Sequence, residues 1–215
     1  MFVANRMTKN PTTVTPATTL DEASSLMKKG KFRRLPVVED GRLVGFFSDK
    51  DLMRVAPSPA TTLSRYEERS LLDKLTVRDI MSKKVISVPE DATIEEAALI
   101  MCENKVGGLP VVSSVGAVVG VITETDIFKT FVDVMGLMDG KTRLTIETED
   151  KVGVVNELSA VFADHGLSID SLVTCRQPNG KYEIVIRGDV PDAAAVKAEI
   201  EAKGYHVIHV VRIGG

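Results

Sequence analysis

The feature that most constrains this chain is an internal repeat. Shifted by 74 residues, the sequence overlays itself, and the tetrapeptide at 35–38 falls on the identical LPVV at 109–112. After a one-residue slip the match continues, so that GFFSDKD at 45–51 aligns with GVITETD at 120–126. Self-similarity at a fixed spacing indicates one structural unit used more than once. The repeat therefore predicts two domains of the same fold in the first part of the chain.

Both copies carry the same signal for the start of a helix. Thr19 stands three residues before Glu22, and Thr93 stands three residues before Glu96. This is the spacing of a capping box, in which the threonine begins the helix and the glutamate bonds back to it. Apolar residues then recur at helical spacing in both copies. We expect matching amphipathic helices.

The ends of these helices and the strands that follow are also repeated. We expect the helices to end at Gly30 and Asn104, because glycine and asparagine tolerate the left-handed backbone that closes a helix. Two short apolar runs separated by a turn then predict a pair of strands. A second helix is expected after 45–51 and after 120–126. The predicted order in each copy is strand, helix, strand, strand, helix.

The repeated stretches place a hydroxyl three residues before an aspartate: Ser48 with Asp51, and Thr123 with Asp126. Before a helix, such a pair can be a plain cap that stabilises the helix by roughly 1 kcal/mol. The same groups also suit a ligand. A carboxylate accepts two hydroxyl donors at once, as a ribose diol requires, and a helix N-terminus offers N–H groups to a phosphate. Both interpretations stay open, because one hydroxyl can cap an empty site and contact a ligand in a filled one.

Glycines and arginines near these pairs add to the candidate site. Gly45 and Gly120 would let the backbone approach a ligand or another strand closely. Arg33 and Arg34 precede the first LPVV, whereas two glycines precede the second. A guanidinium can hold phosphate oxygens in a bidentate fork, which a glycine cannot do. We therefore expect two unequal sites, with the arginines serving a phosphate in one; the alternative is that they form a solvated edge.

The pattern changes after residue 140. Alternating and helical stretches follow in the order strand, helix, strand, strand, helix, strand over 141–215. This βαββαβ order is the ferredoxin-like arrangement. The expected fold class of the whole chain is therefore α+β.

The repeated half resembles a known family. Two copies in register, each with LPVV and with glycine, two apolar residues, a hydroxyl and an aspartate, look like a tandem pair of CBS domains, or Bateman module. The resemblance places the domains at 1–58 and 77–135, with a connecting helix at 59–76. The family is expected to have two clefts between its paired domains.

The resemblance also implies a ligand for these clefts. CBS pairs often hold an adenine nucleotide such as AMP, ADP or ATP, or S-adenosylmethionine. In the family pattern the aspartate bonds ribose hydroxyls, and the serine or threonine lies near the ribose or phosphate. The matching residues are Ser48 with Asp51, and Thr123 with Asp126.

The last third, about 142–213, resembles an ACT domain. ACT domains usually pair side by side and often bind an amino acid where the first strand turns into the first helix. Here that turn has the family's acid and glycine, but Val152 stands where many members have proline. The implied contacts come from Asp150, Gly153, Val154 and Asn156. The alternative is that these residues only shape a turn and a helix surface.

A CBS pair followed by an ACT domain resembles the AcuB-type proteins associated with acetoin utilisation. The resemblance implies a non-catalytic regulatory sensor that binds an adenosyl ligand and forms a homodimer or larger homo-oligomer. It names no regulated partner. The alternative from another class is a scaffold or interaction protein that binds no ligand.

Composition and motifs exclude several other classes. A formal net charge of -3 at pH 7 does not fit a nucleic-acid binder. No apolar run approaches the roughly 20 residues of a membrane span, the N-terminus lacks a signal peptide, and the two cysteines stand far apart, so we expect a cytoplasmic protein. No common catalytic motif is present, and His206 and His209 should face opposite sides of a regular strand. We therefore expect no enzyme activity, no metal and no cofactor.

Overall fold

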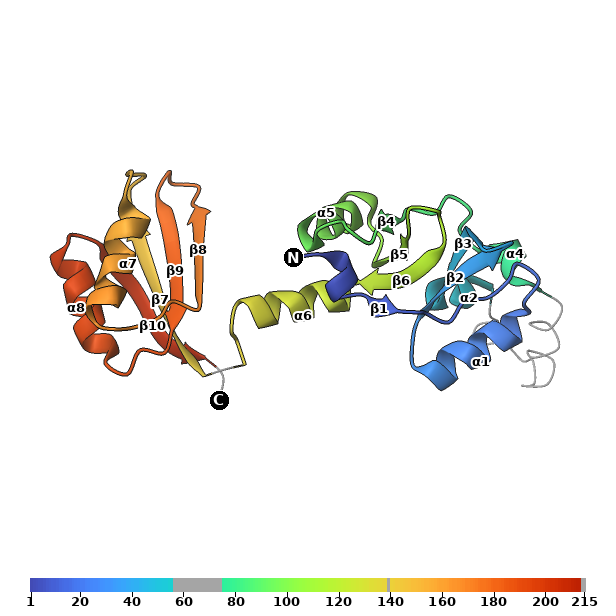
Figure 1. Cartoon of the computed structure of the whole chain (residues 1–215), viewed down its shortest axis with the longest axis horizontal. Coiled ribbons are helices and arrows are strands. Elements are labelled where there is room, and N and C mark those ends of the chain that lie inside the picture. The colour runs from blue at the N-terminus through green and yellow to red at the C-terminus, as the bar shows by residue number, and fades with distance from the viewer. Residues whose placement is uncertain (56–74, 139, 214–215) are drawn as a thin grey trace. The chain divides into compact units, whose positions relative to one another are not determined.

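The computed structural model describes residues 1–55, 75–138 and 140–213, and Figure 1 shows the arrangement of their elements. Two compact units make up the chain, residues 1–127 and 128–215, and they are described separately. This division falls within a helix, somewhat before the predicted domain boundary. The predicted connecting helix at 59–76 lies outside the described residues as far as residue 74.

Both copies of the repeat contain the predicted elements. The first copy consists of η1 (Val3–Asn5), β1 (Thr8–Lys9), α1 (Leu20–Gly30), β2 (Arg34–Glu39), β3 (Arg42–Ser48) and α2 (Asp49–Val55). The second consists of α4 (Val77–Ile80), β4 (Val88–Pro89), α5 (Ile94–Asn104), β5 (Gly108–Val112), β6 (Val118–Thr123) and α6 (Glu124–Val134). The short helices η1 and α4 were not predicted.

Each copy gives its first residues to the sheet of the other copy. Thr8 of β1 pairs with Val121 of β6, and Ser82, its repeat equivalent, forms an antiparallel bridge with Phe46 of β3. The resulting sheet has the order β1-β6-β5-β4, while β2 pairs with β3 (Figure 1). Because of this exchange, a cleft beside either strand pair has walls from both copies.

Two apolar cores lie under these sheets, one for each copy. Both are built from the first long helix and the paired strands. The first contains Val14, Leu20, Ala23, Met27, Leu35, Val37, Phe47 and Val77. The second contains Val3, Val88, Ala92, Ile94, Ala97, Met101, Leu109, Val111 and Ile122. Val3 and Val77 each come from the short helix that the repeat did not predict.

The starts and the ends of α1 and α5 are confirmed, and only the position of the left-handed residue is corrected. Both helices have the predicted threonine–glutamate capping box. Gly30 and Asn104 are the last residues of the helices, as predicted, but the left-handed residues are Lys31 and Lys105, each with φ of 54°. Gly30 is required for space, because a β-carbon there would lie 1.9 Å from the ring of Phe32.

The C-terminal unit has the predicted βαββαβ order. Its elements are β7 (Lys141–Thr148), α7 (Val154–Asp164), β8 (Ser171–Arg176), β9 (Tyr182–Gly188), α8 (Ala193–Ala202) and β10 (His206–Ile213). The strands form one antiparallel sheet in the order β10-β7-β9-β8, with α7 and α8 packed on one face (Figure 1). The chain contains both helices and strands, and this mixed secondary structure confirms the α+β class.

One prediction in this unit fails because of a bulge. The register of β10 shifts between Val207 and His209, so His206 pairs with Glu147 and His209 pairs with Thr145. Side chains that pair across strands share a face, and residues two apart on β7 also share one. The two histidines therefore lie on the same face of the sheet.

Among the described residues, no helix has the length and apolar character needed to cross a membrane.

Candidate functional site

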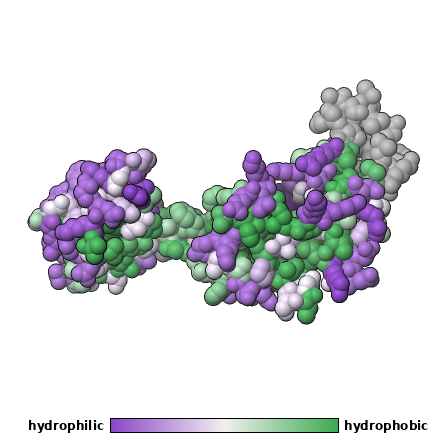
Figure 2. Space-filling model, turned by 90° about the horizontal axis from the view of Figure 1, so that it is seen from above, coloured by the Kyte–Doolittle hydropathy of each residue, from purple (hydrophilic) through white to green (hydrophobic). Residues whose placement is uncertain are grey.

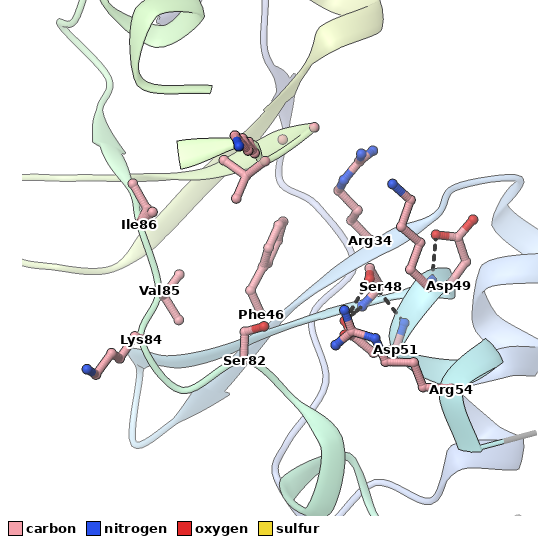
Figure 3. A pocket seen from close by; sticks show the side chains of 15 residues that line it. Arg34, Phe46, Ser48, Asp49, Asp51, Arg54, Ser82, Lys84, Val85 and Ile86 are labelled. Carbon is pink, nitrogen blue, oxygen red and sulfur yellow. Dashed lines mark hydrogen bonds and ion pairs between the residues drawn. The ribbon is translucent and has the colours of Figure 1, made fainter. Parts of the chain in front are cut away.

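The first candidate site, cleft A, lies between the two copies. It has a volume of about 230 Å³, slightly below the usual range for ligand pockets. Its walls come from the end of β3 and the start of α2, from the segment after α4, and from the segment before β5 (Figure 3). The lining residues are Arg34, Phe46, Ser48, Asp49, Lys50, Asp51, Arg54, Ser82, Lys84, Val85, Ile86, Lys105, Val106, Gly107 and Gly108.

A second cleft of about 270 Å³, cleft B, occupies the equivalent place in the repeat. It is lined by Thr8, Asn10, Pro11, Thr12, Phe32, Arg33, Arg34, Val121 and Thr123. Every one of these residues is the repeat equivalent of a residue that lines cleft A. The two clefts are therefore built by the same parts of the fold, and their chemical differences come from side chains.

In cleft A, Ser48 and Asp51 form a tight capping arrangement. The Ser48 N–H donates to Asp51 Oδ2 at 2.9 Å and the Ser48 hydroxyl donates to the same oxygen at 2.6 Å. Asp51 is only 8% exposed. Its other oxygen, Oδ1, lies 3.5 Å from Nη1 of Arg54, a side chain that is itself largely exposed (Figure 3). One carboxylate oxygen thus caps α2 while the other faces a weak, exposed partner.

Beside cleft B, Thr123 and Asp126 repeat this geometry. The Thr123 N–H and hydroxyl donate to Asp126 Oδ2 at 2.9 and 2.7 Å. Thr123 lines the cleft, whereas Asp126 is half-buried and is not among the lining residues. The structure therefore brings Ser48 and Asp51 together in cleft A, but in cleft B it places only the hydroxyl at the wall.

A third pair shows that this geometry alone does not make a site. At the start of α4, the Thr76 N–H and hydroxyl donate to Asp79 Oδ2 at 2.8 and 2.9 Å. These bonds lower the pKa of Asp79 below its ordinary value. Neither residue lines cleft A or cleft B. What distinguishes Asp51 from Asp79 is its position in a cleft and not its hydrogen bonds.

Arg34 lines both clefts. Burial, and to a smaller extent the neighbouring Arg33, lowers the pKa of Arg34, while the carboxylates of Glu124, Asp49 and Asp126 act in the opposite direction. A guanidinium stays charged in proteins. Arg34 is therefore a partly desolvated cation between the first turns of α2 and α6. Its guanidinium could bind an anionic ligand in either cleft.

Gly45 and Gly120 fit the second of the two predicted roles, the close approach of another segment of backbone. Neither lines a cleft. A β-carbon at Gly45 would lie 2.3 Å from Sδ of Met81, and one at Gly120 would lie 2.2 Å from Sδ of Met7. The space above each glycine is filled by a methionine from the other copy, so these glycines serve the exchange of segments between the copies.

Sequence reasoning missed the apolar part of cleft A. Phe46 lies between the wall that carries Val85 and Ile86 and the wall that carries Ser48 and Arg34 (Figure 3). The segment after Met81 supplies Val85 and Ile86, and it reaches this place because Ser82 bridges to Phe46. Val85 and Ile86 are the repeat equivalents of Pro11 and Thr12, which line cleft B, but no motif marks either pair in the sequence.

The C-terminal unit brings all four predicted ligand residues into one pocket of about 220 Å³. Asp150, Gly153, Val154 and Asn156 line it, together with side chains of β8 and β9. Gly153 has φ of 94°, a conformation that glycine adopts without strain, and it begins α7. The pocket therefore faces the N-terminus of an 11-residue helix, where backbone N–H groups can receive a carboxylate.

Glu157, in the first turn of this helix, contacts Tyr205 and Lys151. Tyr205 donates to Glu157 Oε2 at 2.6 Å, and Lys151 lies 3.7 Å from Oε1. Burial, with the hydrogen bond to Glu157, raises the pKa of Tyr205 to about 12. The same hydrogen bond lowers the pKa of Glu157. Within the described part of the chain, no group of three or more histidine, cysteine, aspartate or glutamate side chains could hold a metal ion.

Family profiles match most of the chain. The profile of the CBS domain matches residues 3–58 and 77–133, and that of the ACT domain matches residues 142–204. A CBS domain-containing protein of Dictyostelium discoideum is 31% identical over 136 residues, which are 63% of this chain and 94% of that protein. Inosine-5'-monophosphate dehydrogenase of Aquifex aeolicus is 32% identical over 209 residues, which are 90% of this chain but only 40% of the dehydrogenase.

Solved structures of CBS-domain proteins match the repeated half. The CBS-domain pair of protein MJ0100, in complex with 5'-methylthioadenosine and S-adenosyl-L-methionine, is 27% identical with a TM-score of 0.52, over 62% of this chain and 97% of that one. CBSX2 of Arabidopsis thaliana in complex with AMP is 29% identical with a TM-score of 0.52, over 62% and 97%. A Vibrio cholerae protein named for acetoin utilization, AcuB, is 30% identical with a TM-score of 0.52, over 64% and 94%.

Proposed function

The chain belongs to the CBS-domain family, as a CBS-domain pair followed by an ACT domain, and from this premise we propose that it is a regulatory protein whose CBS pair binds an adenosine-containing ligand. The single observation that carries the proposal is cleft A. It combines a buried carboxylate, an apolar wall and a partly desolvated arginine within one site.

Each part of cleft A suits one part of such a ligand. The adenine ring would lie against Phe46, Val85 and Ile86, because an aromatic base gains most from apolar and aromatic contacts. The ribose hydroxyls would donate to Asp51, whose Oδ1 has, among the described residues, a 3.5 Å contact with the exposed Arg54. Arg34 would receive a phosphate or carboxylate of the ligand. Relatives support this assignment, since their solved structures contain AMP, 5'-methylthioadenosine or S-adenosyl-L-methionine.

Thermal melting tests the proposal with AMP, ADP, ATP, 5'-methylthioadenosine and S-adenosylmethionine. A ligand at about 100 times its Kd should add roughly 2.7 kcal/mol to the free energy of unfolding. Asp51→Ala should abolish the shift that arises from cleft A. Asp79→Ala is the matched control, because it removes a carboxylate with the same capping bonds outside both clefts. If no adenosyl compound shifts the melting temperature, the ligand-free scaffold becomes the better account.

The regulated activity would lie on a partner. The dehydrogenase relative shows that CBS domains also occur as parts of enzymes, but this chain matches only 40% of that protein, and its matched families are the CBS and ACT domains. The likeness to the Vibrio cholerae protein makes acetoin utilisation one pathway in which to seek the partner. Co-purification with tagged protein, with and without ligand, would identify it.

We also propose that the protein forms a homodimer or larger homo-oligomer in the cytoplasm. Phe128, Phe131 and Val134 of α6 are 69%, 52% and 47% exposed, and Figure 2 shows this region as largely hydrophobic. In the C-terminal sheet, β8 is an edge strand, and pairing would satisfy its open side. Light scattering at micromolar concentration should give a mass of at least two chains; a monomer would contradict the proposal.

The ACT pocket supports a second ligand, a free amino acid. Its carboxylate would lie at the N-terminus of α7, with the Asn156 amide and Asp150 beside it. Val152, which stands in the place of proline, is 98% exposed, so the substitution leaves the pocket wall intact. Melting with the common amino acids tests this, with Gly153→Ala as the variant that should lose the shift. An equal shift in Gly153→Ala would place the amino acid elsewhere.

A further inference from the structure

We propose that Arg34 is a phosphate ligand common to both clefts, so that a phosphate-bearing nucleotide in one cleft lowers the affinity of the other cleft for such a nucleotide. This inference rests on the proposed function. It begins with position: Arg34 lines cleft A and cleft B, whereas its repeat equivalent Gly108 lines cleft A alone. Two equivalent clefts therefore have one arginine between them at this place.

The packing around Arg34 leaves little space for a second arginine. Its side chain lies on the backbone of the other copy: a β-carbon at Gly107 would be 2.4 Å from Arg34 Nη2, and one at Gly108 would be 3.0 Å from Arg34 Cδ and Nε. The glycines before the second LPVV thus provide the space that the arginine of the first copy occupies. The sequence difference between the copies is a matched pair of changes that leaves a single guanidinium.

The charges around Arg34 come from both sides. Asp49 belongs to the first turn of α2, beside cleft A, while Glu124 and Asp126 belong to the first turn of α6, beside cleft B. All three favour the charged guanidinium. Arg34 can therefore turn toward either cleft without losing carboxylate neighbours. A phosphate in one cleft would draw the guanidinium to that side and away from the other.

The remaining cations decide which cleft is affected more. Cleft A also contains Lys50, Arg54, Lys84 and Lys105, although Lys84 points away from the labelled cluster in Figure 3. Among the lining residues of cleft B, the cationic side chains are Arg33 and Arg34. Cleft A should therefore bind a phosphate more tightly than cleft B, and Arg34 should then contact the phosphate in cleft A. Cleft B then suits an adenosyl ligand without phosphate.

Two blocking variants at equivalent positions separate the clefts. Ile86→Trp fills cleft A and Thr12→Trp fills cleft B, and neither touches the arginine or a hydroxyl–aspartate pair. Calorimetry with AMP should give two unequal sites in the wild type. In Ile86→Trp, cleft B should bind AMP about tenfold more tightly than it does in the wild type, since it regains a charge-assisted hydrogen-bonding partner. Adenosine, which has no phosphate, should bind cleft B equally in both proteins.

Arg34→Met provides the decisive background, because methionine keeps much of the apolar stem on Gly108 but has no charge. There, blocking cleft A should leave the AMP affinity of cleft B unchanged. Arg33→Ala is the matched control: it should weaken AMP in cleft B and leave the tenfold effect of blocking in place. If Ile86→Trp leaves the AMP affinity of cleft B unchanged when Arg34 is present, the proposed sharing of Arg34 is wrong, while the proposed function still stands. Absence of AMP binding together with absence of binding of every other adenosyl compound in the melting test would overturn the proposed function and this inference together.

Discussion

The two CBS copies have the same fold and yet meet at a point where they must differ. In the first copy Arg34 extends across the contact, and in the second Gly107 and Gly108 receive it. A second arginine at Gly108 would crowd Arg34, and two pairs of glycines would leave both clefts without the guanidinium. Duplication thus gives two equivalent clefts, and packing between the copies makes them chemically unequal. Four changes test how far this comparison holds, in decreasing order of expected effect.

Gly108→Arg makes the second copy like the first and should have the largest effect. The new side chain would clash with Arg34 Cδ at 3.0 Å and with the Ile122 carbonyl oxygen at 3.2 Å from its β-carbon. Overpacking of this kind, with two like charges together, should cost about 3 kcal/mol in urea unfolding. The double change Arg34→Gly with Gly108→Arg moves the arginine to the other copy and should recover much of this loss. Unchanged stability in Gly108→Arg would mean that the copies do not need to differ.

Asp51→Ala compared with Asp126→Ala tests whether the two caps are equally embedded. Asp51 is 8% exposed and accepts two bonds from Ser48, so its loss should cost about 2 kcal/mol without any ligand. Asp126 accepts the same two bonds from Thr123 but is less buried, so its loss should cost less. Urea unfolding of both variants without nucleotide measures the difference. A larger loss in Asp126→Ala would reverse the order that burial gives.

Gly45→Ala and Gly120→Ala test a place where the copies are alike. Each new β-carbon meets the sulfur of a methionine from the other copy, at 2.3 and 2.2 Å. Because a methionine side chain can move, we expect each change to cost about 1 kcal/mol. Thermal unfolding should therefore show nearly equal losses. A large difference between them would show that the exchanged segments are not packed equivalently.

Glu96→Gln and Glu22→Gln compare the capping boxes and should have the smallest effect. Glu96 Oε2 accepts from the Thr93 N–H at 2.7 Å and from its hydroxyl at 2.9 Å, whereas Glu22 Oε2 accepts from the Thr19 N–H at 3.0 Å. The bonds from Thr93 lower the pKa of Glu96. Its stabilisation is therefore complete above the pKa of an unfolded glutamate and is lost as the pH falls through the lower folded value. Unfolding measured from neutral to acid pH should show a smaller acid loss in Glu96→Gln than in the wild type; an identical profile would contradict it.

Much of the fold could be predicted because its signals are local. The capping boxes at Thr19 and Thr93 depend on residues three apart, and the βαββαβ order depends on periodicity within each element. Errors arose where a distant residue decides. The bulge in β10, which depends on pairing with β7, places His206 and His209 on one face.

The candidate site shows the same division. The motif located Ser48, Asp51 and Thr123 at cleft walls, but Thr76 and Asp79 share that motif and line neither cleft. No motif marked Val85 and Ile86, which reach cleft A through a bridge between the copies. The spacing of residues in the sequence predicts the hydrogen bonds of a local cap. It does not predict which caps the other copy encloses in a cleft.

By itself, the sequence determined that one α+β unit occurs twice and is followed by a ferredoxin-like domain, because periodicity and caps are properties of neighbouring residues. It also showed that arginines precede one LPVV and glycines the other. Only the tertiary structure decided that these differences meet, because the exchange of segments brings β2 of one copy against β5 and β6 of the other. GFFSDKD and GVITETD are caps in both copies. Their surroundings, and one shared arginine, make their clefts different.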